Sequence, residues 1–162
     1  SLTLLSALFG ITEINLCKSS NLSIIALMLG GFLVQGMSEE FIFRGYLKNT
    51  LGGRHNPWTA VIVSSAAFSL AHILNPGFSF LVFINLTLFG IFAGLYMIAF
   101  DDIWGACAIH SIWNFTQGSI YGISVSGTGE NESIFRTTAV SSSVLLKPIP
   151  TSKIIFLSSI EK

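Results

Sequence analysis

One long interval of this chain is almost free of charge. Between Arg54 and Glu130 the only Asp, Glu, Lys or Arg residues are Asp101 and Asp102. Helices of soluble proteins present charged and polar residues on the face turned to water. Ordinary soluble domains are also about 25% charged, whereas this chain is 10% charged. The interval therefore predicts an integral membrane protein whose apolar side chains face lipid.

The apolar segments are long enough for several membrane helices, since one crossing needs about 20 largely apolar residues. We expect helices at roughly 22–51, 57–74, 78–100 and 103–125, with the end of another in residues 1–17. The chain starts without Met, which predicts a fragment that lacks upstream helices. The expected fold class is all-α, a polytopic transmembrane bundle of about four to five helices without strands.

This helical core is predicted to cover residues 1–125, and residues 126–162 are predicted to form a poorly structured tail. The tail is rich in Ser and Thr, which favour solvated turns. Pro148 and Pro150 prevent a helix from running through it. Its last apolar piece, "KIIFLSSI", is too short to cross a bilayer.

Charge and cysteine content exclude other classes of protein. Eight basic and eight acidic residues cancel, so no basic surface for nucleic acid is expected. Cys17 and Cys107 lie in apolar surroundings without a CxxC spacing, which argues against a disulfide framework or a metal cluster. The partner that the composition predicts is membrane lipid.

The predicted spans nevertheless contain polar and ionisable side chains. Such residues are costly inside a bilayer, so they are functional candidates. They come from three predicted helices, and a polar centre forms if the three helices face one another. They are Glu39, Glu40, Arg44, His72, His110 and Asn114.

The spacing of these residues distinguishes those that can form an ion pair from the one that is left for catalysis. Glu40 and Arg44 are four residues apart, share a helix face and can form an ion pair. Glu39 is turned about 100° away from Glu40, so it is the carboxylate predicted to be free for chemistry. His110 and Asn114 are also four residues apart, and the amide can fix a histidine tautomer or hold a carbonyl.

A carboxylate, two imidazoles and an amide in a dry pocket can activate water. In this interpretation Glu39 takes the proton, and His72, His110 and Asn114 orient the water or stabilise the oxyanion of a tetrahedral intermediate. A seryl GxSxG motif is absent from the sequence. The HExxH motif is absent too, since His72 and His110 lie 38 residues apart.

Three short motifs resemble those of one protein family. "EEFIFR" resembles the EExxxR motif of the CPBP family, which comprises CAAX proteases and bacteriocin-processing enzymes. "FSLAH" and "HSIWN" are similar to its FxxxH and HxxxN motifs, in the same order. The resemblance covers roughly residues 25–125 and implies an all-α intramembrane endopeptidase of the bacterial plasma membrane.

The same resemblance assigns roles to residues. It implies that Glu39, His72, His110 and Asn114 surround a catalytic water, with Glu40 and Arg44 as support. Eukaryotic members of the family remove the last three residues of prenylated proteins, so a prenylated protein is one substrate class implied.

Three alternatives stay open at the level of sequence. Glu39, His72 and His110 make a plausible zinc site of two histidines and a glutamate, although Asn114 is a poor zinc ligand and we favour a glutamate-dependent water. Buried Glu and His residues also serve ion-coupled transporters. A membrane binding protein of the bacteriocin immunity type could use the same fold without catalysis, and would tolerate Glu39→Ala.

Overall fold

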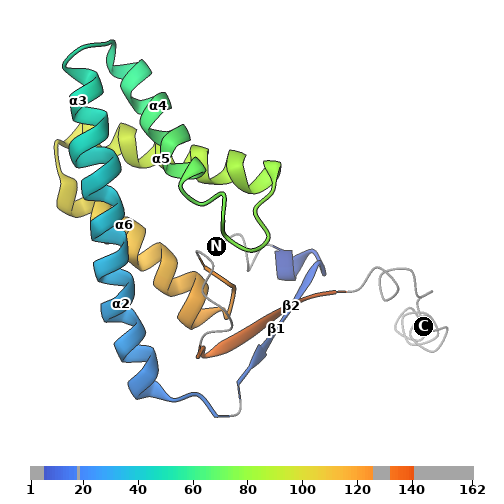
Figure 1. The fold of residues 1–162 in the computed structure, drawn as a ribbon. Helices are drawn as coiled ribbons and strands as arrows, with labels where there is room; N and C mark the ends of the chain where they lie inside the picture. The colour runs from blue at the N-terminus through green and yellow to red at the C-terminus, as the bar shows by residue number, and fades with distance from the viewer. Residues whose placement is uncertain (1–5, 18, 126–131, 141–162) are drawn as a thin grey trace, which may run out of the picture. The chain divides into compact units, whose positions relative to one another are not determined.

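A computed structural model describes residues 6–17, 19–125 and 132–140 of the chain. Most of the described residues are helical (Figure 1). The elements are β1 (Thr12–Leu16), α2 (Leu22–Glu40), the π-helix η1 (Phe41–Lys48), α3 (Asn49–Gly52), α4 (Pro57–Leu70), α5 (Phe80–Phe100), α6 (Ile103–Phe115), the π-helix η2 (Thr116–Ile120) and β2 (Phe135–Ala139).

The described residues divide into two units: the larger lies within Leu16–Arg136, and the smaller joins residues that precede and follow it in the chain. The first of these holds α2 to η2. The second holds most of β1 and β2, which pair as a two-stranded antiparallel sheet. The backbone N–H of Val140 donates to the carbonyl of Ile11 at one end of that sheet.

Polar caps begin each of the main helices. The side chain of Asn21 accepts hydrogen bonds from the first turn of α2, and that of Asn56 does so for α4, where Pro57 takes the first helical position. Ser79 caps α5 in the same way. Asp102 caps α6 by accepting from the backbone of Trp104 and Gly105. The predicted helix starts are therefore close to those observed.

Two helix pairs build the larger unit, α2 with α6 and α4 with α5. Glycine allows both close approaches. A methyl group at Gly36 of α2 would collide with the backbone and hydroxyl of Ser111 on α6. A methyl group at Gly90 of α5 would meet Ser65 of α4 at 2.8 Å. Small residues thus let these helices pack backbone to backbone.

Two helical segments are long and apolar enough to cross a membrane within the described residues, Leu22–Gly52 and Phe80–Phe100. The first is α2, η1 and α3 run end to end, as Figure 1 shows. Helix α4 is apolar but shorter, with 14 residues. The expected span at 103–125 is divided at Phe115, where α6 gives way to η2. The mostly helical fold is confirmed, and a bundle of four to five spans stays a prediction.

The expectation of a chain without strands was wrong. Residues 6–8 are helical, but Gly10 takes a positive φ of 69° and the chain continues as β1 instead of a membrane helix. In "EINL", the last four residues of β1, polar and apolar residues alternate, which is the strand period. Its partner β2 lies in the segment predicted as a poorly structured tail; residues 126–131 and 141–162 of that tail lie outside the described residues.

Candidate active site

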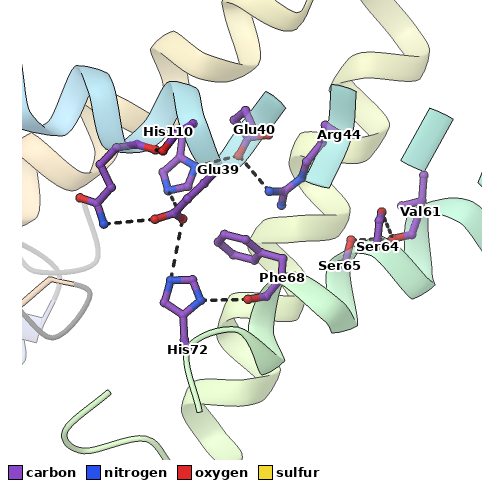
Figure 2. Close-up of polar contacts among 11 residues, drawn as sticks. Glu39, Glu40, Arg44, Val61, Ser64, Ser65, Phe68, His72 and His110 are labelled. Carbon is purple, nitrogen blue, oxygen red and sulfur yellow. Dashed lines mark hydrogen bonds and ion pairs between the residues drawn. The ribbon is translucent and has the colours of Figure 1, made fainter. Parts of the chain in front are cut away.

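The first part of the site is a buried ion pair on one helix. Nη1 of Arg44 lies 3.0 Å from Oε1 of Glu40, and both side chains are completely buried. The Arg44 guanidinium also lies over the ring of Phe68, 4.4 Å from its centre. Arg44 belongs to η1, so the widened helix begins directly after the two glutamates. The ion pair expected from the spacing is present (Figure 2).

His110 of α6 is bound to the same glutamate oxygen. Its Nδ1 lies 2.7 Å from Oε1 of Glu40. Since Glu40 is paired with Arg44, its carboxylate accepts and Nδ1 of His110 donates. In the neutral imidazole the proton therefore sits on Nδ1, and Nε2 presents a lone pair. Glu40 thus orients His110 in addition to pairing with Arg44.

His72 lies just past the end of α4 and is oriented in a similar way. Its Nδ1 is 2.9 Å from the backbone carbonyl oxygen of Phe68. A carbonyl oxygen only accepts, so Nδ1 carries the proton of the neutral ring and Nε2 is an acceptor. The ring also contacts the Phe68 side chain edge to face, with centroids 4.9 Å apart. One phenylalanine therefore holds His72 by both backbone and side chain.

Glu39 lies between the two histidines. Its Oε2 is 3.8 Å from Nε2 of His72 and 3.7 Å from Nε2 of His110. Figure 2 shows the carboxylate pointing toward both rings. These separations exceed those of direct hydrogen bonds, and all three atoms are acceptors. They leave Oε2 directed at the space between the imidazoles, where a group with two donors fits.

The other oxygen of Glu39 has a partner that the sequence reasoning missed. Nε2 of Gln35, one turn earlier on α2, donates to Oε1 of Glu39 over 3.2 Å. The spacing of four residues is the same rule that identified Glu40 and Arg44. The signal was therefore present in the sequence, but Gln35 carries no charge and belongs to none of the three motifs.

Asn114 follows His110 by one turn of α6 and is buried, with 5% of its surface exposed. In the part of the chain that the structure describes, its Nδ2 has no hydrogen-bond partner. A buried amide donor without a partner costs about 1–3 kcal/mol. Such a donor is suited to hold an oxygen of a bound substrate.

Aromatic rings enclose the imidazoles. Phe89 of α5 packs against His110 with centroids 5.0 Å apart and against Trp113 at 6.0 Å. Phe68 approaches His110 from another direction, at 5.8 Å. Phe89 was not singled out from the sequence, since nothing distinguishes it from the other phenylalanines of an apolar helix. These rings keep water away from the charged groups and strengthen their interactions.

All six predicted site residues therefore lie in the larger unit. No group of three or more His, Cys, Asp and Glu side chains that could hold a metal ion is found among residues 6–17, 19–125 and 132–140, and the zinc site of Glu39, His72 and His110 stays a prediction.

The chain matches a protein-family model. The model described as Rce1-like, type II CAAX prenyl endopeptidase, covers residues 21–116, and so includes every predicted site residue. No curated protein matches the chain. No solved structure matches it either.

Proposed function

Because the chain belongs to the family of Rce1-like type II CAAX prenyl endopeptidases, we propose that it is an intramembrane endopeptidase that hydrolyses a peptide bond with water activated by Glu39. The family is one of proteases, and its membership together with the two long apolar helices indicates an integral membrane protein. We propose further that α4 and α6 also lie within the bilayer, which in this proposal is a bacterial plasma membrane.

One observation carries the proposal. Oε2 of Glu39 lies within 3.8 Å of Nε2 of His72 and of Nε2 of His110, and all three atoms are acceptors. Water brings two O–H donors and a nucleophilic oxygen, so it satisfies acceptors that otherwise repel one another. The hydrogen bonds to the two Nδ1 atoms keep both lone pairs directed at this point.

The reaction then follows from the positions of these groups. Glu39 takes a proton from the water while the water oxygen forms a bond to the substrate carbonyl carbon. The oxyanion that develops is held by Nδ2 of Asn114, the buried donor without a partner. As the carbon–nitrogen bond breaks, Glu39 returns its proton to the leaving amine. The substrate in this proposal is a peptide or a prenylated protein.

Turnover of a prenylated CAAX peptide by the purified protein in detergent tests the proposal. Glu39→Gln keeps the shape and the hydrogen bond from Gln35, but removes the base. We expect kcat to fall by about 10²–10⁴, the usual contribution of a general base. Glu13→Gln, in β1, is the matched control and should cleave like the wild type. Near-normal turnover by Glu39→Gln would show that Glu39 is not the base, as a purely binding protein requires.

The same assay decides between water alone and a zinc ion. In our proposal a chelator leaves the rate unchanged, because no step uses a metal. A loss of rate that is restored by added zinc would instead favour the site of Glu39, His72 and His110 predicted as the alternative.

A further inference from the structure

Gln35 is a polar residue next to the site, and it has no part in the proposed reaction. It lies in α2, half-buried, four residues before Glu39. Its side chain is joined to the Glu39 carboxylate by the 3.2 Å hydrogen bond from Nε2 to Oε1. The amide nitrogen must face the carboxylate, because the amide oxygen would repel it.

The surroundings of Glu39 make this hydrogen bond important. On the side of Oε2 stand the Nε2 atoms of His72 and His110, and neither can donate in the neutral tautomer fixed by its Nδ1 contact. Oε2 is buried and has no hydrogen-bond partner within the described residues. The Nε2 lone pairs of the two histidines therefore repel Oε2. The Glu39 side chain has three rotatable bonds and can turn away from them unless another contact holds it.

We infer that Gln35 is a positioning residue, which anchors Oε1 of Glu39 so that Oε2 stays directed at the point between the two imidazoles. Gln35 does not touch the reacting atoms in this arrangement. It acts through Glu39 alone, by holding one oxygen and supplying the donor that a buried carboxylate needs. The inference rests on the proposed function, since it gives Gln35 a part in the same reaction.

A polar residue that only fills space on the helix would behave differently. Gln35→Met keeps the length, the unbranched shape and the helix propensity of the side chain, and removes only the donor. Substitution of a space-filling glutamine by methionine would leave kcat unchanged. Loss of the anchor, in contrast, lowers kcat and leaves KM unchanged, because substrate binding does not involve Gln35.

The first measurement is steady-state cleavage of the prenylated peptide by the full chain. We expect kcat of Gln35→Met to fall about tenfold or more, the size of one hydrogen bond to a charged group, with KM unaltered. Ser38→Ala is the matched control. It removes a hydrogen bond from the same turn, the one from the Ser38 hydroxyl to the Gln35 carbonyl, and should leave kcat as in the wild type.

The second measurement does not depend on turnover. Subtracting the infrared spectrum of Glu39→Gln from that of the wild type isolates the antisymmetric stretch of the Glu39 carboxylate. Subtracting the spectrum of the double variant Gln35→Met/Glu39→Gln from that of Gln35→Met isolates the same band without the anchor. This band should lie at higher wavenumber, because the carboxylate has lost the hydrogen bond that Gln35 donates. Should Gln35→Met not fold, Gln35→Leu is measured in the same way.

The outcomes separate the two claims. An unmoved carboxylate band, an unchanged kcat in Gln35→Met, or a rise in KM that accounts for the loss would each overturn the positioning role. If the wild type does not cleave, or Glu39→Gln cleaves normally, the proposed function fails, and the infrared band still decides whether Gln35 anchors Glu39.

Discussion

Glu40 contacts two partners through one oxygen, and its two tasks can be separated by mutation. Oε1 of Glu40 lies 3.0 Å from Arg44 and 2.7 Å from His110, with both glutamate and arginine fully buried. Removal of one member of a buried ion pair leaves an uncompensated charge and costs about 3–5 kcal/mol. Replacement of both members by apolar residues of similar volume is often neutral. Stability and activity should therefore respond differently.

We predict that Arg44→Met lowers the thermal unfolding temperature in detergent strongly, whereas the double variant Glu40→Met/Arg44→Met recovers most of the stability. Turnover should stay low in the double variant, because Nδ1 of His110 has lost its acceptor and the ring is no longer oriented. Lys48→Met, one turn further along the helix, is the control and should change stability by less than about 0.5 kcal/mol. Recovery of turnover in the double variant would contradict the role of Glu40 in orienting His110.

At this scale the sequence was informative wherever the geometry is local. The contact of Glu40 with Arg44 follows from helix spacing, and so does that of Gln35 with Glu39, although no motif marks the latter. The approach of His110 to Glu40 spans 70 residues of sequence, and the sequence predicted only that the two helices meet. Which glutamate oxygen faces which ring depends on helix rotation, which periodicity does not determine in an apolar helix.

The close packing of α2 against α6 brings the glutamates to His110, and Gly36 is the residue that permits it. A side chain there would collide with Ser111. We predict that Gly36→Ala costs about 1–3 kcal/mol, as overpacking does, and lowers kcat because Glu39 and Glu40 move away from the imidazole. Gly31→Ala, on the same helix with nothing within 4 Å of the added methyl group, should be neutral or stabilising by up to about 1 kcal/mol.

The measurement is chemical or thermal unfolding of both variants alongside turnover of the peptide. Equal stability and activity of Gly36→Ala and Gly31→Ala would show that α2 does not approach α6 as closely as described. The comparison removes the effect of helix propensity, since both substitutions are the same and both lie inside α2.

At the scale of elements, the helix starts were predictable from the sequence, but the pairing of the two strands was not. The expected helix starts at residues 22, 57 and 103 agree with the structure. The π-helix η1 was missed, because apolar periodicity does not distinguish π from α geometry over so few residues. The pairing of β1 with β2 was missed as well, because it joins segments at opposite ends of the described chain and neither strand is longer than five residues.

At the scale of the whole larger unit, charged and polar side chains are buried while many large apolar side chains are exposed. Glu40 and Arg44 are fully buried, whereas Leu27 is 74% exposed, Leu81 67% and Leu88 57%. Soluble proteins bury ionisable residues only rarely. The distribution matches a protein whose surroundings are lipid, in which the outward leucines need no cover and the inward charges of Glu40 and Arg44 pair with each other.

This distribution leads to a prediction for α5. Leu88 lies in the middle part of that helix and Phe100, 67% exposed, at its end beside Asp101. A lysine near the centre of a spanning helix costs about 2.5–3.5 kcal/mol on insertion scales, and much less at an interface, where it reaches the headgroups. We therefore expect Leu88→Lys to reduce the fraction of chain that resists alkaline carbonate extraction from membranes, and Phe100→Lys to leave it near that of the wild type. In a water-soluble protein an exposed leucine or phenylalanine could be exchanged for lysine at either place without loss, so equal behaviour of the two variants would show that α5 does not cross the bilayer.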